Sequence, residues 1–109
     1  MIVCVPVTNE GLIDPRWGRA DRVAVATVDG ASIADWQEFD VGWGTLHDAG
    51  TEGSHHARIA TFLLDHKVEA VAAHHMGAAM SHMLGKMGLT VMLDETGNAR
   101  EAAARMAVR

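Results

Sequence analysis

Histidines are the residues of this sequence with the greatest capacity for chemistry, and there are seven of them in 109 residues. Two adjacent pairs, His55-His56 and His74-His75, are candidate metal ligands, and so is His47, which lies in a glycine-rich stretch before the first pair. Imidazole binds zinc, copper, iron and nickel. Adjacent side chains diverge on a helix, so we expect a site that takes one or two rings from each pair. The spacing matches neither the HExxH motif nor a zinc finger, and it selects no particular metal.

Sulfur-containing side chains are the second group with possible chemistry. Four methionines (Met76, Met80, Met83 and Met87) recur at helical spacing, which predicts a stripe that packs against a sheet. Only Met76 falls at the same predicted edge as the histidines, where it is a candidate soft ligand. Cys4, the single cysteine, lies in an apolar run and is predicted to be buried and unreactive.

The elements that must position these residues follow from hydrophobic periodicity. Residues 2–7 are wholly apolar, which predicts a strand covered on both faces. Polar residues 8–22 predict a long loop, and the glycine-rich residues 41–53 predict another. We expect further strands at residues 22–28, 32–40, 69–73 and 89–93, with Asp29-Gly30 as a hairpin turn, and helices from Thr51 or Ser54 to about His66, at residues 77–86, and from Asn98 onward.

This order of elements predicts a single α/β domain over residues 1–109, with helices on both faces of a five-stranded mixed sheet. Right-handed crossovers give the strand order 3-2-1-4-5, with strand 2 antiparallel. Ligands collect beyond the carboxyl ends of strands where the winding direction switches, here between strands 1 and 4. The segments expected at that edge are residues 8–21, 41–54, 73–77 and 94–97.

Composition limits the possible partners. With 14 acidic and 9 basic residues the net charge is −5, which disfavours binding to nucleic acid or to an anionic membrane. Hydrophobic residues make up 49% of the chain, as in a globular domain rather than a disordered one. The opening segment, MIVCVPVTNE, has no charged leader, and its apolar run is too short for a signal peptide or a membrane span. We therefore expect a cytoplasmic protein.

The loop after the first strand contains a recognisable motif, Asp14-Pro15-Arg16-Trp17-Gly18-Arg19-Ala20, hereafter the signature loop. It resembles the loop that commonly reads His-Phe-Gly-Arg-Ala in the nitrogenase iron–molybdenum-cofactor-binding family (NifX-like and NifB C-terminal-like domains). The similarity continues through Pro6, Asp29-Gly30, Gly53, residues 68–71 before a loop with Gly77, and residues 84–91. The resemblance implies a ribonuclease-H-like three-layer fold and does not imply a catalyst, so we expect a protein that is not an enzyme. It also implies a cargo, a metal ion or an iron–molybdenum-type metal–sulfur cluster, exchanged with donor and recipient proteins, and a possible homodimer.

The sequence departs from the family at the positions that matter for binding. Arg16 stands where the family has histidine and Trp17 where it has phenylalanine, while Gly18 and Arg19 are retained. The two histidine pairs occupy the family's glycine-rich helix start and the loop after its strand, which suggests that the imidazoles have moved to other walls of the crevice. We expect the cofactor to contact Arg16, Trp17, Gly18, Arg19, Met76 and Gly77. The two arginines could hold an anionic cluster through forked hydrogen bonds.

Three other functions compete with that of a metal or metallocluster carrier. A mononuclear zinc hydrolase could use His55, His56 and either His74 or His75 as ligands, with Glu52 or Asp48 as general base. A metal-free module could bind an anion or a partner protein, with histidines as pH-responsive contacts. A two-metal nuclease is disfavoured because the apolar strand at residues 2–7 has no carboxylate.

Overall fold

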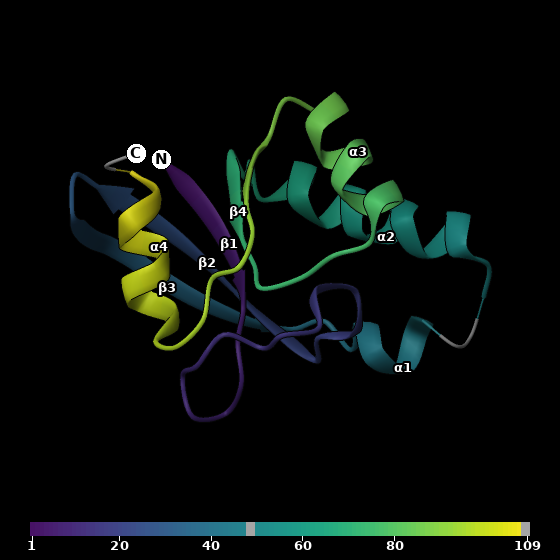
Figure 1. The fold of residues 1–109 in the computed structure, drawn as a ribbon, viewed down its shortest axis with the longest axis horizontal. Helices are drawn as coiled ribbons and strands as arrows, with labels where there is room; N and C mark the ends of the chain where they lie inside the picture. The colour runs from purple at the N-terminus through teal and green to yellow at the C-terminus, as the bar shows by residue number, and fades with distance from the viewer. Residues whose placement is uncertain (48–49, 108–109) are drawn as a thin grey trace.

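The computed structural model describes residues 1–47 and 50–107, and these form the expected five-stranded mixed sheet in the order β3-β2-β1-β4-β5 (Figure 1). The central strand β1 pairs antiparallel with β2 and parallel with β4. The strands are β1 (Ile2–Pro6), β2 (Arg22–Asp29), β3 (Ser32–Asp40), β4 (Ala70–Ala72) and β5 (Thr90–Met92). The helices are the 3-10 turn η1 (Trp17–Arg19), α1 (Trp43–His47), α2 (Glu52–Asp65), α3 (Ala78–Lys86) and α4 (Ala99–Met106).

Alternating side chains of β1 supply two separate cores, one on each face of the sheet. Val3 and Val5 pack with the apolar face of α4, whereas Cys4 points to the opposite face and packs with residues of α2 and α3. Figure 1 shows α4 on one side of the sheet and α2 with α3 on the other. The prediction of helices on both faces is therefore confirmed.

The starts of α2 and α4 are set by side-chain caps, as the sequence predicts. Thr51 accepts a hydrogen bond from the backbone N–H of Ser54 at 3.0 Å, so Thr51 rather than Ser54 caps α2. Asn98 caps α4 in the same way, accepting from the N–H of Glu101 at 3.0 Å. Each cap satisfies a backbone donor that has no partner within the helix.

The helix α1 corrects the expectation of a continuous glycine-rich loop over residues 41–53. Its first residue, Trp43, is buried and meets the ring of Trp17 edge-on, with 5.2 Å between ring centroids. It also meets Phe62 of α2 at 5.8 Å. Packing between distant aromatic rings therefore stabilises a helix that its local sequence does not favour.

None of the helices within the described ranges combines the length and the apolar character needed to cross a membrane.

Candidate functional site

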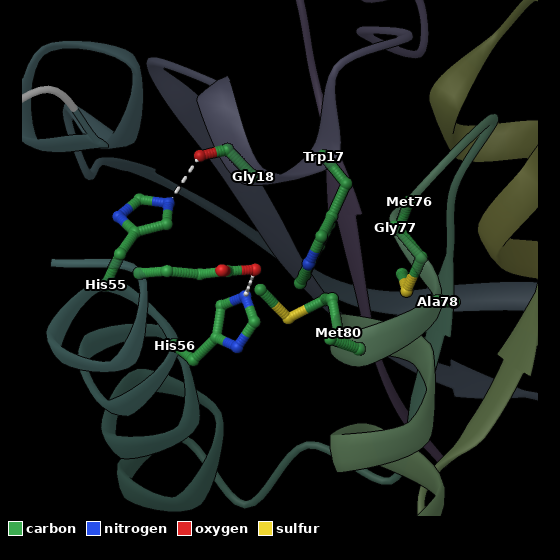
Figure 2. Close-up of a pocket in the computed structure, with 10 residues that line it drawn as sticks. Trp17, Gly18, His55, His56, Met76, Gly77, Ala78 and Met80 are labelled. Carbon is green, nitrogen blue, oxygen red and sulfur yellow. Dashed lines mark hydrogen bonds and ion pairs between the residues drawn. The ribbon is translucent and has the colours of Figure 1, made fainter.

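The signature loop and the starts of α2 and α3 enclose a pocket of about 260 Å³ (Figure 2). Three of the four segments expected at the carboxyl edge of β1 and β4 contribute to it; residues 94–97 do not. The lining residues are Trp17, Gly18, Glu52, His55, His56, Met76, Gly77, Ala78, Ala79 and Met80.

A second hollow of about 280 Å³ adjoins the first and shares part of its lining. Trp17-Gly18 and Met76-Gly77 line both spaces. The second hollow is completed by Pro15, Arg16, Arg19 and His75. All six candidate cofactor-contacting residues therefore line one or both of these spaces.

Backbone bridges at three positions hold the loop that follows β1. Val7 pairs with Ile13, Leu12 with Asn98 at the start of α4, and Arg16 with His75 beyond β4. The first bridge closes the loop on itself, and the other two join it to the start of α4 and to the segment after β4. The wall that carries Trp17 is therefore fixed to two other parts of the fold.

The Arg16 side chain is held by Asp14 within the same loop. The buried Asp14 carboxylate accepts from the backbone N–H of Arg16 at 2.9 Å and from its Nε at 3.3 Å. This hydrogen bond and the adjacent negative charge raise the pKa of the Arg16 guanidinium. Arg16 therefore stays charged, but part of its charge is already balanced within the loop.

His55 is a structural link between α2 and the signature loop. Its Nε2 lies 2.7 Å from the carbonyl oxygen of Gly18, and its Nδ1 lies 3.2 Å from Nη1 of Arg58 (Figure 2 shows the first contact). A carbonyl can only accept and a guanidinium can only donate, so the proton is on Nε2 and the lone pair of Nδ1 faces Arg58. Both ring nitrogens are therefore engaged, and neither is available to bind a metal.

His56 also lines the pocket, but its ring has a different environment from that of His55. Its Nε2 lies 3.8 Å from Oε1 of Glu52, one turn earlier on α2. That separation is too long for a hydrogen bond. The side chain is only partly exposed, at 21% of its surface. It is directed at the space between α2 and α3 (Figure 2).

The second histidine pair does not join the first. His75 lines the adjoining hollow, while Nδ1 of His74 is buried and has no hydrogen-bond partner within the described ranges. His47 ends α1, and its side chain, like the whole of Asp48, lies outside the described residues. Within residues 1–47 and 50–107, no three His, Cys, Asp or Glu side chains are close enough to hold a metal ion. The predicted convergence of imidazoles is therefore not found there, and neither is the three-histidine zinc site of the hydrolase alternative.

Trp17 presents an unsatisfied donor at the pocket. The residue is 1% exposed, yet its indole Nε1 has no hydrogen-bond partner among the described residues. Figure 2 shows the nitrogen on the part of the ring that reaches toward Met80. A buried donor without an acceptor carries a desolvation cost, which a ligand with an acceptor atom would relieve.

Met80 is the pocket residue that the sequence analysis assigned only to core packing. It is 4% exposed and lies in the first turn of α3, beside Met76 at 7%. The available signal was its position one helical turn after Met76, at the helix end nearest the predicted crevice. The remaining stripe residues, Met83 and Met87, pack against the core as predicted.

The electrostatics of the pocket favour negative charge. The N-terminal ends of two helices, α2 with 14 residues and α3 with 9, contribute lining residues to it. Helix N-termini carry partial positive charge and unpaired N–H groups, which stabilise anions. The exposed carboxylate of Glu52 opposes this effect locally.

Comparison with solved structures shows that the fold is shared. The crystal structure of PH0822 has a TM-score of 0.76 at 15% identity and covers 97% of this chain and 90% of that one. The apo form of the orange protein from Desulfovibrio gigas gives 0.72 at 23%, covering 98% and 86%. A putative NifB protein from Thermotoga, solved by NMR, gives 0.69 at 20%, covering 98% and 87%. No curated protein matches the chain.

The model of one protein family matches almost the whole sequence. This family is described as dinitrogenase iron-molybdenum cofactor, and the match runs over residues 1–108. The resemblance carried by the signature loop is therefore confirmed along the full length of the chain. The chain belongs to the dinitrogenase iron–molybdenum cofactor family.

Proposed function

We propose that this protein carries an anionic metal–sulfur cluster, of the iron–molybdenum type, between a donor protein and a recipient protein. The cargo occupies the pocket between the signature loop, α2 and α3. Family membership supports the class of cargo, and the pocket supports its position.

The observation that carries the proposal is the unpaired indole N–H of Trp17, buried in the pocket wall. Sulfide and oxygen ligands at the surface of an anionic cluster accept hydrogen bonds, and this donor has no acceptor in the part of the chain that the structure describes. The N-termini of α2 and α3 add favourable electrostatics. Carriage of this kind relies on hydrogen bonds and charge, so it does not require three protein ligands on one metal.

The other predicted site residues take distinct roles in this proposal. His56 and Met76 are the side chains placed to ligate a metal atom of the cargo, and His55 positions the loop. Gly18 and Gly77 let the cargo approach the backbone. Arg16 and Arg19 at the adjoining hollow interact with a part of the cargo that extends beyond the pocket.

The test compares two tryptophan variants for uptake of isolated iron–molybdenum cofactor. Protein prepared without an affinity tag is incubated with the cofactor without oxygen, and molybdenum per chain is measured after gel filtration. Trp17→Phe keeps the ring and removes the donor. We expect its affinity to fall about tenfold or more, because hydrogen bonds to charged groups contribute about 1.5–3 kcal/mol. Trp36→Phe, on the α4 side of the sheet, is the matched control and should bind like the wild type.

Two results would contradict the proposal. One is wild-type protein that retains no molybdenum. The other is an unchanged affinity of Trp17→Phe for the cofactor, which would show that the indole N–H does not contact the cargo.

A further inference from the structure

The outer edge of β3 is a long stretch of backbone that no other strand of the described residues covers. We propose that this edge binds an extended, basic segment of a partner protein, which joins the sheet as a further strand. The edge is a different surface from the pocket of the proposed cluster cargo, and its binding of a partner does not depend on that cargo.

The position of β3 in the sheet leaves one side of its backbone without a neighbour. β3 is the last strand on its side of the sheet (Figure 1), and within residues 1–47 and 50–107 it pairs with β2 alone. An edge strand presents unpaired N–H and C=O groups along its outer side. None of the nine residues of β3 is buried, and β5, at the other edge, is only three residues long. β3 is therefore the edge with more backbone for an added strand to pair with.

The regular part of β3 also offers side-chain contacts on both faces. Its register with β2 shifts near Val28 and then runs without interruption from Asp35 to Asp40. This stretch has the usual length of a strand. Trp36 and Phe39 lie on opposite faces of it, each partly packed against one of the two cores. An added strand would therefore have an aromatic neighbour on each face.

The charge of the edge selects the kind of strand that binds. β3 carries the carboxylates of Asp35, Glu38 and Asp40 and contains no lysine or arginine. Arg22 of β2 pairs with Asp40 at 2.9 Å and lies 3.6 Å from Glu38, so a single arginine balances part of this charge. A second copy of β3 would bring like charges together, whereas lysine or arginine at alternate positions of a partner strand would pair with them. The edge therefore favours a basic partner over a second copy of this chain.

A hollow of about 240 Å³ lies at the Asp40 end of β3 and continues the negative charge. Four of its lining side chains are acidic and two are arginines, each of which is already paired with one of these acids. The net negative charge of the lining suits a lysine or arginine side chain at the end of the added segment. The lining residues are Val7, Thr8, Asn9, Glu10, Asp14, Arg16, Asp21, Arg22 and Asp40.

This hollow brings the partner to the signature loop. Asp14 and Arg16 belong to that loop, and Arg16 also lines the hollow that adjoins the pocket. A partner that lies along β3 and places a basic side chain in the hollow therefore contacts the same loop that forms a wall of the pocket.

Fluorescence anisotropy tests the proposal with synthetic peptides in place of the partner. The probe is a fluorescein-labelled peptide of alternating lysine and threonine, as long as β3. The comparison peptide is N-methylated at every residue, which keeps its charges and removes its backbone donors. We expect it to bind at least about tenfold more weakly, because several backbone hydrogen bonds are lost. Equal binding of the two peptides would show that charge alone attracts them, and that result, or no binding of the probe, would overturn strand addition.

Matched charge variants locate the bound peptide. Asp35→Asn with Glu38→Gln removes two charges from β3. The control, Asp65→Asn with Asp94→Asn, removes two exposed charges from the end of α2 and from the segment after β5, at the opposite edge of the sheet. We expect the first pair to weaken peptide binding at least about fivefold and the control less than about twofold, since each pair of surface charges contributes modestly. Equal effects of the two variants would rule out β3 as the site.

Amide NMR of the unaltered protein gives a result that does not depend on how the variants fold. The peptide should shift the backbone amide signals of residues 35–40 and slow their hydrogen exchange, while the signals of β5 stay in place. Shifts that are absent from β3, or equally large at β5, would refute the site. Spectra of the protein alone at rising concentration test the second copy as occupant. Signals of β3 that move with protein concentration would show that the chain pairs with itself there, which would refute the assignment to a basic partner.

Discussion

The Nε2 atom of His55 donates a hydrogen bond of 2.7 Å to the carbonyl oxygen of Gly18, joining the first turn of α2 to the signature loop. The two residues are 37 positions apart, and the ring between them is buried. The contact therefore sets the distance between two walls of the pocket.

Replacement of His55 by alanine should destabilise the protein by about 2–3 kcal/mol. It leaves the Gly18 carbonyl without its partner and opens a cavity beneath α2. Urea unfolding measures the change, with His82→Ala on the exposed surface of α3 as the control, expected within about 0.5 kcal/mol of wild type. Equal effects of the two variants would show that the His55 contact contributes nothing to stability.

Gly44 and Gly53 provide a paired test of how closely α1 approaches the signature loop. A Cβ on Gly44 would lie 2.6 Å from the carbonyl oxygen of Arg19, whereas one on Gly53 would meet nothing within 4 Å. Gly44→Ala should therefore cost about 1–3 kcal/mol through overpacking. Gly53→Ala should be neutral or up to about 1 kcal/mol stabilising, because alanine favours the helix. Thermal melts of the two variants compare them directly, and a stabilising Gly44→Ala would contradict the close contact.

Lys67, just beyond the C-cap of α2, has a backbone conformation that suits glycine. Its φ is 56°, its N–H donates to the carbonyl of Leu64, and the next N–H, of Val68, donates to that of Leu63. Glycine adopts this left-handed backbone without the Cβ penalty, so Lys67→Gly should stabilise the fold by about 0.5–1 kcal/mol.

Gly88 after α3 supplies the opposite case. Its φ is +82°, so Gly88→Ala should destabilise by about 1 kcal/mol. Chemical denaturation of both variants tests the pair. If Lys67→Gly lowers the free energy of unfolding, the lysine side chain stabilises the fold by more than its left-handed backbone conformation costs.

Cys4 should make stability depend on pH in alkaline solution. Burial raises the pKa of its thiol above the ordinary value of 9.0, so the folded protein keeps a proton that the unfolded chain loses. This contribution is fully present below pH 9 and declines as the pH rises, by about 1.4 kcal/mol between pH 8 and pH 10. The chain has no tyrosine to titrate in the same range.

The measurement is the free energy of unfolding of wild type and Cys4→Ala across this range. Lysine and amino-terminal contributions cancel in the difference between the two proteins. If the free energies of unfolding of the two proteins change in parallel with pH, burial does not raise the pKa of the Cys4 thiol. Alkylation of the native thiol should likewise proceed only as fast as the protein unfolds.

Local signals were sufficient to predict most of the fold. Thr51 and Asn98 mark helix starts through their own caps, and Asp29-Gly30 marks the hairpin. The strand order followed from crossover handedness. The helix at Trp43 escaped prediction because its stability comes from rings distant in sequence, Trp17 and Phe62.

The site was harder to predict because the type of a residue does not show which groups its side chain forms hydrogen bonds with. The sequence placed His55 at the correct edge, but it could not show that the carbonyl of Gly18 and the guanidinium of Arg58 engage both its nitrogens. His74 and His75 follow one strand, yet only His75 lines the hollow next to the pocket. Helical spacing assigned Met80 to the core, and its second role at the pocket depends on where α3 begins.

The three backbone bridges of the loop after β1 have a consequence for the entropy of loading. Main-chain pairing at Ile13, Leu12 and Arg16 holds this wall in place. The wall is therefore already ordered before any ligand binds to it. For the cargo proposed above, binding would therefore cost less backbone ordering entropy than binding to a disordered loop.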